Sequence, residues 1–127
     1  MEQSTFGLSQ IGQIAVNVHD LDRATAFYRD KLGMRHLFTV PKMSFFDCGG
    51  VRLLLALPEK PEFDHASSII YYSVGDINQA YQALSGRDVQ FETKPHLVAK
   101  LESHDLWMAF CRDSEGNLLS LMCEQSR

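Results

Sequence analysis

Two stretches of the sequence repeat one pattern of apolar and polar residues. IAVNVHDL at residues 14–21 aligns without a gap with IYYSVGDI at residues 70–77. Each stretch begins with a β-type run rich in Ile, Val and Tyr, and each run is followed by an aspartate, Asp20 or Asp76, where a helix N-cap would lie. The pattern therefore predicts, twice, a strand that leads into a capped helix.

Helical periodicity follows both aspartates. The apolar positions recur at three- and four-residue spacing: Leu21, Ala24, Phe27, Tyr28 and Leu32 in the first segment, and Ile77, Ala80, Tyr81 and Leu84 in the second. Gly33 and Gly86 lie where these helices would end. We expect one amphipathic helix of about three turns and a shorter second helix.

Three β-type stretches follow each predicted helix. In the first half they span residues 35–40, 42–47 and 51–57, with a tight turn at residues 48–50; in the second half they span residues 89–92, 106–112 and 118–123, with a turn at residues 113–117. The halves share one βαβββ design. We predict an α+β fold in a single domain, residues 1–127, with modules at about 9–57 and 67–124.

Two segments fall outside this pattern. The polar, Pro-rich residues 58–64 are expected to form a linker too short to separate independent domains. Residues 93–105, which include Pro95, His96 and His104, are expected to form a long connection. Such a loop is either a functional rim or lid, or a plain surface excursion.

The whole pattern resembles the vicinal-oxygen-chelate (VOC) superfamily of glyoxalase, bleomycin-resistance and dioxygenase proteins. Besides the repeat, the resemblance rests on AFYRDKLGM at residues 26–34 and FCRDSEGN at residues 110–117. It covers nearly the whole chain and implies two βαβββ modules around a cupped mixed sheet that encloses a small-molecule pocket. It also implies a homodimer, since modules of this family pair within or between chains to complete the pocket.

The resemblance further implies where a divalent metal would be held, at one position on the first and one on the last strand of each module. These positions fall on Gln13, Leu54, Ile69 and Ser120. Gln13 is the one retained ligand-type residue. Leu and Ile have no lone pair to donate and a serine hydroxyl is a poor ligand. We therefore expect no metal cofactor.

Strand alternation predicts which side chains line the cup. Gln13 and Asn17 share one face of the first strand, and by the same period Arg52, Tyr71, Ser120 and Met122 point inward. Arg52 would bind an anionic group, with a solvated strand-end arginine as the alternative. Tyr71, Phe45, Trp107 and Met122 would stack on a planar ligand, with plain core packing as the alternative. The predicted ligand-binding residues are Gln13, Asn17, Arg52, Tyr71, Trp107, Ser120 and Met122.

The remaining chemistry-bearing residues point to no named acid/base pair. His36, His65, His96 and His104 lack metal-binding or catalytic spacing and are interpreted as exposed or structural histidines, with a general acid/base or a displaced metal site as the alternative. The catalytic residues, if there are any, are not identified. The three cysteines include no CxxC motif, which indicates reduced thiols.

Composition and charge narrow the range of possible binding partners. The 127 residues carry a formal charge of -4 and no stripe of basic residues, which disfavours nucleic acid. No apolar run is long enough to span a membrane and no signal peptide is recognised, so we expect a cytoplasmic protein.

Three functions are open. The first is a metal-independent protein that binds a small organic molecule, as bleomycin-resistance proteins sequester a toxic compound at a dimer interface. The second is a metal-dependent glyoxalase-like lyase, isomerase or dioxygenase with unconventional ligands, and the third is an interaction module. Whether the chain is an enzyme stays undecided, because fold alone does not fix function.

Overall fold

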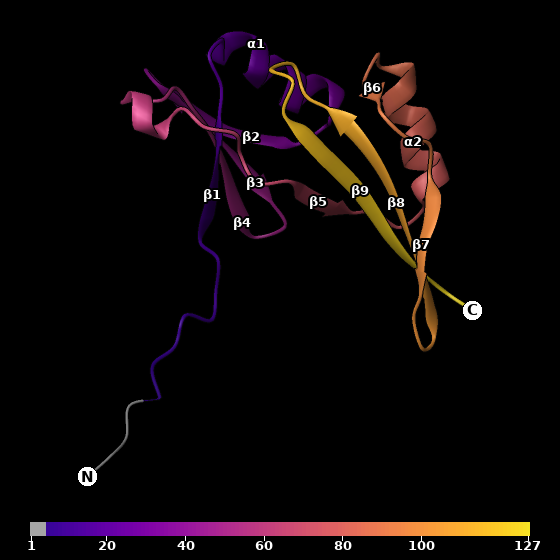
Figure 1. The fold of residues 1–127 in the computed structure, drawn as a ribbon. Helices are drawn as coiled ribbons and strands as arrows, with labels where there is room; N and C mark the ends of the chain where they lie inside the picture. Colours follow the sequence, from indigo (N-terminus) through magenta and orange to yellow (C-terminus); the bar gives the residue numbers. More distant parts are fainter. Residues whose placement is uncertain (1–4) are drawn as a thin grey trace.

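The computed structural model describes residues 5–127, so residues 1–4 of the predicted domain lie outside the described residues. Two mixed sheets are arranged side by side, with a helix against each (Figure 1). The α+β class is confirmed. Among residues 5–127 no helix is long and apolar enough to cross a membrane.

Module one forms the first sheet, in the order β1-β4-β3-β2, with β1 parallel to β4. Its elements are β1 (Gln13–Asn17), α1 (Leu21–Ala26), a π-helical turn (Phe27–Lys31), β2 (Arg35–Val40), β3 (Met43–Cys48) and β4 (Val51–Ala56). A 3-10 turn (Pro61–Phe63) then lies within the linker. The order of elements is the one that the pattern predicts for the first half.

Module two forms the second sheet, in the order β5-β9-β8-β6, and β7 also pairs with β8. Its elements are β5 (Ile70–Ser73), α2 (Ile77–Gly86), β6 (Gln90–Phe91), β7 (His96–Lys100), β8 (His104–Arg112) and β9 (Leu118–Ser126). β5 is parallel to β9, as β1 is to β4. The two halves therefore repeat one topology.

The prediction of a long unstructured connection over residues 93–105 was wrong. Residues 96–100 form β7, which pairs antiparallel with β8 from His96 opposite Met108 to Lys100 opposite Asp105. Val98 favours a strand, and a register shift between Leu97 and Ala99 breaks the alternation of side chains. A loop remains only between β7 and β8 and around Pro95.

The predicted helix ends are confirmed. Asp20 and Asp76 each accept a hydrogen bond from the backbone N–H three residues later, at 3.1 and 3.0 Å. Gly33 has a φ of +71°, the left-handed conformation expected just after a helix. The first helical segment differs in one respect: its second half widens, and Leu32 N–H donates to the Phe27 carbonyl five residues earlier.

One core joins the two modules. The helix-facing side chains of both sheets belong to the same buried cluster, including Leu55 and Phe46 from module one and Leu121 and Ala109 from module two. Tyr28 lies between them and donates a 2.7 Å hydrogen bond from its hydroxyl to Asp113. Burial and the Asp113 charge raise the pKa of Tyr28 far above its usual range, so the hydroxyl stays protonated.

Candidate functional site

The face of each sheet that points away from the shared core is called here its cup face. On the first sheet, the register places Gln13 opposite Arg52 and Asn17 opposite Ala56. Ile14, Val16 and Val18 turn to the helices instead, and Val16 and Val18 are buried. The predicted alternation along this strand is confirmed, and Gln13, Asn17 and Arg52 share one cup face.

Arg52 rests on an aromatic row that crosses the first cup face. Its guanidinium carbon lies 5.5 Å from the centre of the Phe45 ring, and Phe38 of the neighbouring strand stacks on Phe45 with ring centres 4.5 Å apart. Phe38 is 45% exposed. No hydrogen bond or ion pair to the Arg52 guanidinium is found within residues 5–127. Its N–H donors are therefore available to an anion.

The second cup face carries its own aromatic group. Tyr71 lies opposite Ser120, and Ser120 lies opposite Phe110. The Tyr71 and Phe110 rings meet edge to face at 6.0 Å, and His96 stacks on the other side of Phe110 at 6.4 Å. Met122 occupies the same face opposite Met108. The structure brings together Tyr71, Ser120 and Met122 as the alternation predicts.

Two of the predicted ligand-binding residues, Ser120 and Trp107, are placed less favourably for contact with a ligand. The Ser120 hydroxyl is fully buried and donates to the carbonyls of Ala109 and Leu121. Trp107 lies opposite Cys123, on the helix side of β8, and packs against the core. Its indole N–H is buried without a hydrogen-bond partner among the described residues. The structure therefore separates Trp107 from the other candidates.

Period-two alternation along residues 106–112 alone would have found Phe110. It puts Leu106, Met108 and Phe110 on the face opposite Trp107. Trp107 is a suitable stacking residue by its type, but its position in the strand turns it to the helix side. Phe110 therefore takes the place on the second cup face that Trp107 was expected to fill.

The donor set at the implied metal positions does not fit a divalent ion. Gln13 begins β1, while Leu54 and Ser120 are buried and Ile69 lies just before β5. Two of these four side chains are hydrocarbon, and the Ser120 hydroxyl is engaged by backbone carbonyls. Within the described part of the chain, no group of three or more His, Cys, Asp or Glu side chains is arranged to hold a metal.

The four histidines considered from the sequence lie apart, each with a local partner. His36 contacts Thr39 and the Phe46 ring, His65 the Ala66 carbonyl, His96 the Lys94 carbonyl, and His104 the Ser103 hydroxyl. The hydrogen-bond partner of each histidine lies within three positions in the sequence. The contact of His36 with the Phe46 ring spans a longer stretch of chain. The structure brings none of these histidines together with another.

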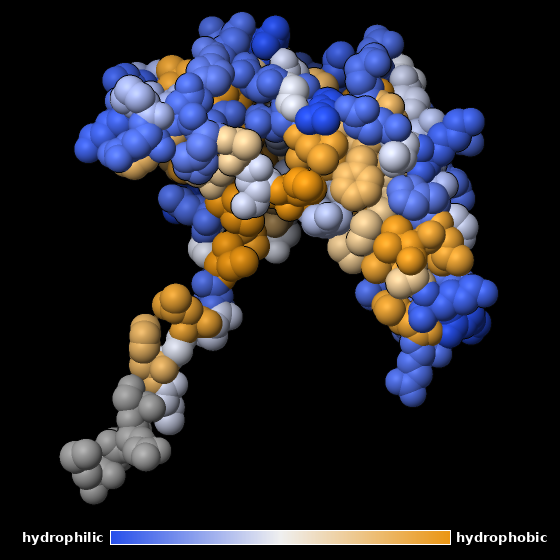
Figure 2. All heavy atoms as spheres, in the orientation of Figure 1, coloured by the Kyte–Doolittle hydropathy of each residue, from blue (hydrophilic) through white to orange (hydrophobic). Residues whose placement is uncertain are grey.

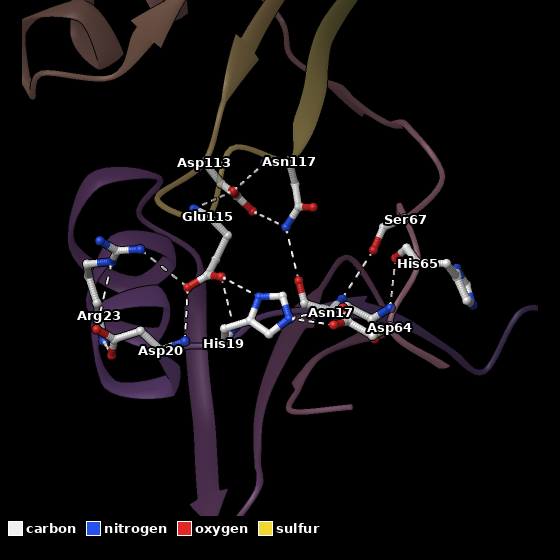
Figure 3. Close-up of polar contacts among 10 residues, drawn as sticks. All are labelled: Asn17, His19, Asp20, Arg23, Asp64, His65, Ser67, Asp113, Glu115 and Asn117. Atoms are coloured by element: carbon white, nitrogen blue, oxygen red, sulfur yellow. Dashed lines mark hydrogen bonds and ion pairs between the residues drawn. The ribbon is translucent and has the colours of Figure 1, made fainter. Parts of the chain in front are cut away.

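The polar cluster that sequence reasoning missed centres on His19 (Figure 3). Its imidazole Nε2 lies 2.9 Å from the Asp64 carboxylate of the linker, and its Nδ1 lies 3.5 Å from Glu115 of module two. The bond and charge of Asp64 raise the pKa of His19 above 6.5. No sequence signal connects residues 45 and 96 positions apart, so only the fold reveals this cluster.

Glu115 ties module two to the start of α1. Its carboxylate accepts the backbone N–H groups of His19 and Asp20 at 2.8 and 3.0 Å and approaches the Arg23 guanidinium at 3.5 Å. Partial burial acts to raise the pKa of Glu115, but these hydrogen bonds outweigh it and hold that pKa below 4.5. The turn at residues 113–117 therefore contacts the helix N-terminus as an anion.

The linker that follows β4 covers one end of the first cup face. The Asn17 amide donates to the carbonyls of Phe63 and His65, at 2.6 and 2.9 Å, and Asn17 N–H donates to the Ser67 hydroxyl. A cavity of about 480 Å³ lies beside these contacts, lined by β1, β3, β4 and the linker. Asn17 thus lines the cavity and also binds the linker that covers it.

Both cup faces are otherwise open in a single chain. Of the described cavities, none is lined by both Arg52 and Met122, or by Phe45 and Phe110. Tyr71 is 43% exposed. Apolar side chains gather at the surface over β5 and β7 and along the N-terminal segment that stands away from the body (Figure 2). The two halves of the candidate site therefore lie in one molecule without enclosing a common pocket.

Comparisons with known proteins agree with this architecture. Residues 10–121 match the model of the Glyoxalase/Bleomycin resistance protein/Dioxygenase superfamily. Because the match covers most of the chain, this protein belongs to that superfamily, the VOC class. Among curated proteins no sequence match is found.

Solved structures of the same class share the fold. A glyoxalase/bleomycin resistance protein/dioxygenase from Alicyclobacillus acidocaldarius is 21% identical with a TM-score of 0.72, covering 91% of each chain. A lactoylglutathione lyase from Agrobacterium tumefaciens is 24% identical with a TM-score of 0.71, covering 91% of this chain and 93% of the other. An integron cassette protein from V. cholerae is 16% identical with a TM-score of 0.78, covering 94% and 98%. At these identities the likeness concerns the fold.

Proposed function

We propose that this protein binds a small organic molecule on its cup faces, and that it does so without the divalent metal ion on which many members of its class depend. The observation that carries the proposal is the pair of cup faces, each apolar with a few hydrogen-bonding groups. Such a lining suits an organic ligand held by a small number of polar contacts. Sequestration of a harmful compound, as in bleomycin resistance, is the role that fits binding without a metal.

A second copy of the chain would close the pocket. Among residues 5–127, the first sheet has β1 and β2 as its edge strands, and the second has β5 at one edge and β6 and β7 at the other. Free strand edges next to exposed apolar side chains favour pairing with another chain. We propose a homodimer in which the first cup face of one copy meets the second cup face of its partner.

The absence of a usable metal site is proposed from the donor set. Gln13 alone supplies a ligand-type side chain at the four positions, and one amide oxygen does not hold a transition metal. Elemental analysis of chelator-treated protein, followed by calorimetric titration with Zn²⁺, Ni²⁺, Mn²⁺ and Fe²⁺, tests this. We expect no stoichiometric binding. Tight binding of one ion per chain would contradict it and direct attention to glyoxalase and dioxygenase assays.

Closure of the pocket by a second copy can be tested by measuring the mass of the protein in solution. The chain mass is 14.4 kDa, so sedimentation equilibrium should give a species of twice that mass. Ala15→Arg introduces a charged side chain on the cup face of β1, at the proposed interface, and should shift the equilibrium to the monomer. Gln82→Arg, on the exposed side of α2, is the control because it adds the same charge away from the cup faces. A wild-type chain that sediments as a monomer would overturn the shared pocket.

A further inference from the structure

We propose that the ligand of the cup is a flat aromatic anion, whose acidic group binds Arg52 and whose ring lies against the aromatic rows. The inference deepens the proposed function, on which it rests, by naming the class of ligand. It depends on three features of the two cup faces: a free guanidinium, a local excess of positive charge, and aromatic rings on both sheets.

The guanidinium of Arg52 lies against an aromatic ring and is not neutralised by a nearby carboxylate. Its carbon is 5.5 Å from the centre of the Phe45 ring, and its N–H groups have no partner within residues 5–127. Within the described residues it has no carboxylate within 4.0 Å, although other arginines do: Arg29 pairs with Asp30 at 2.8 Å and Arg112 with Glu92 at 2.7 Å. A guanidinium held in this way binds a carboxylate or sulfonate through two parallel hydrogen bonds.

The charge around Arg52 favours an anion over a cation. Asp47 lies in the cross-strand row between Arg35 and Arg52, so this row carries two positive charges and one negative charge. The Asp47 carboxylate accepts the N–H of Gly50 and is turned to the hairpin tip. The whole chain has a formal charge of -4, whereas positive charge is in excess in this row. A cationic guest would meet uncompensated positive charge here.

The rings explain why the ligand should be flat. Phe38 and Phe45 stack with an interplanar angle of 25°, and they form a row that ends at Arg52. On the second cup face, Tyr71, Phe110 and His96 form a comparable group. In the proposed dimer these two aromatic surfaces would face one another, and with few polar atoms they would select a planar apolar body, while Arg52 at the end of one row would bind its acidic substituent.

A matched pair of dyes tests the inference. 1-Anilinonaphthalene-8-sulfonate is a flat aromatic anion, and N-phenyl-1-naphthylamine has the same rings without the sulfonate. Saturable binding of the anionic dye should be tighter, and Arg52→Gln should weaken it by about tenfold or more while changing the affinity for the neutral dye by less than about twofold. Arg52→Lys, which keeps the charge but loses the bidentate geometry, should give an intermediate loss.

Controls separate a specific site from general dye binding. Arg29→Gln removes one positive charge far from the cup and should leave both affinities unchanged. Phe45→Leu should weaken the binding of both dyes, since it removes part of the aromatic surface against which the rings of either dye would lie. Equal affinities for the two dyes, or equal effects of Arg52→Gln and Arg29→Gln, would overturn the inference.

The outcome can be distinguished from failure of the proposed function. If the chain sediments as a monomer yet the anionic dye still depends on Arg52, the ligand class stands and closure by a second copy is wrong. If the chain is a metal-free dimer that binds neither dye, the ligand class is wrong and the dimeric cup stands.

Discussion

Single side chains decide how the two modules hold together. Asp113 is buried and accepts hydrogen bonds from the Tyr28 hydroxyl, the backbone N–H groups of Glu115 and Asn117, and the Asn117 amide. A buried carboxylate with several donors avoids the penalty of an unpaired charge. The hydrogen bond from Tyr28 to Asp113 therefore joins the first helical segment to a turn 85 positions later in the sequence.

Removing the Tyr28 hydroxyl should destabilise the protein measurably. We expect Tyr28→Phe to lower the free energy of unfolding by about 2 kcal/mol, because a buried hydrogen bond to a charged group is lost while Asp113 stays buried. Urea denaturation measures the change. Tyr81→Phe is the control, since Tyr81 contacts Phe91 only through its ring. Equal effects of the two variants would contradict the role of the Asp113 contact.

His19 should make stability depend on pH. Its pKa in the folded protein is raised above 6.5 by Asp64, so its contribution is full below pH 6.5 and is lost as the pH rises through the folded pKa. The difference in unfolding free energy between wild type and His19→Asn should therefore be larger at about pH 5.5 than at about pH 8.5.

Glu115 does not change this prediction. Its pKa is lowered below 4.5, so its own contribution is present throughout that range and fades only as the pH falls through the folded pKa. His96→Asn serves as the control, because the His96 ring contacts a carbonyl and not a carboxylate. A pH-independent difference for His19→Asn would show that the contact with Asp64 is not formed in solution.

At the scale of elements, the repeated strand-to-helix unit depends on its capping aspartates and on register. Both helices begin at an Asp whose side chain binds the N–H three residues on, and both first strands pair in parallel with the last strand of their module. The modules differ in the strand after the helix. In module two it is divided into β6 and β7, and both pieces pair with β8.

The cap of α2 offers the cleaner test, because Asp20 is also next to Glu115. Asp76→Ala should lower the unfolding free energy by about 1 kcal/mol, since one N–H at the helix start loses its acceptor. Asp76→Asn keeps an oxygen acceptor and should lose much less. Thermal and urea denaturation would reveal the difference, and similar losses for both variants would exclude capping as the cause.

At the scale of the whole molecule, one core requires the modules to fold together. Phe46 of β3 is fully buried in the cluster that also contains Cys111 and Leu119 of module two. Burial and nearby negative charge raise the pKa of the Cys111 thiol to about 12, so it stays protonated and packs as an apolar group. A cavity made in one module should therefore weaken the other.

Hydrogen exchange can test this coupling. Phe46→Ala should cost about 3–5 kcal/mol and should reduce amide protection in β8 and β9 as much as in β3 and β4. Phe63→Ala, in the linker and 47% exposed, is the control and should leave both modules protected. Loss of protection confined to β2, β3 and β4 would mean that the modules are independent.

Local structure and the class of fold could be predicted from the amino-acid pattern. The repeat around Asp20 and Asp76, the period-two strands and the turn glycines are encoded within about ten residues, where backbone preference and alternation decide the outcome. It also placed Gln13, Asn17, Arg52, Tyr71, Ser120 and Met122 on cup faces. β7 was missed because its apolar run is short and follows Pro95.

Tertiary structure alone decided what depends on contacts between distant segments. It brought His19, Asp64 and Glu115 together, buried the Ser120 hydroxyl against backbone carbonyls and turned Trp107 to the core. It also left the Arg52 guanidinium on Phe45 without a polar partner in the part of the chain that the structure describes. The two cup faces were likewise left without a common pocket among the described cavities. These features follow from strand register and from packing across the modules, which no local pattern in the sequence specifies.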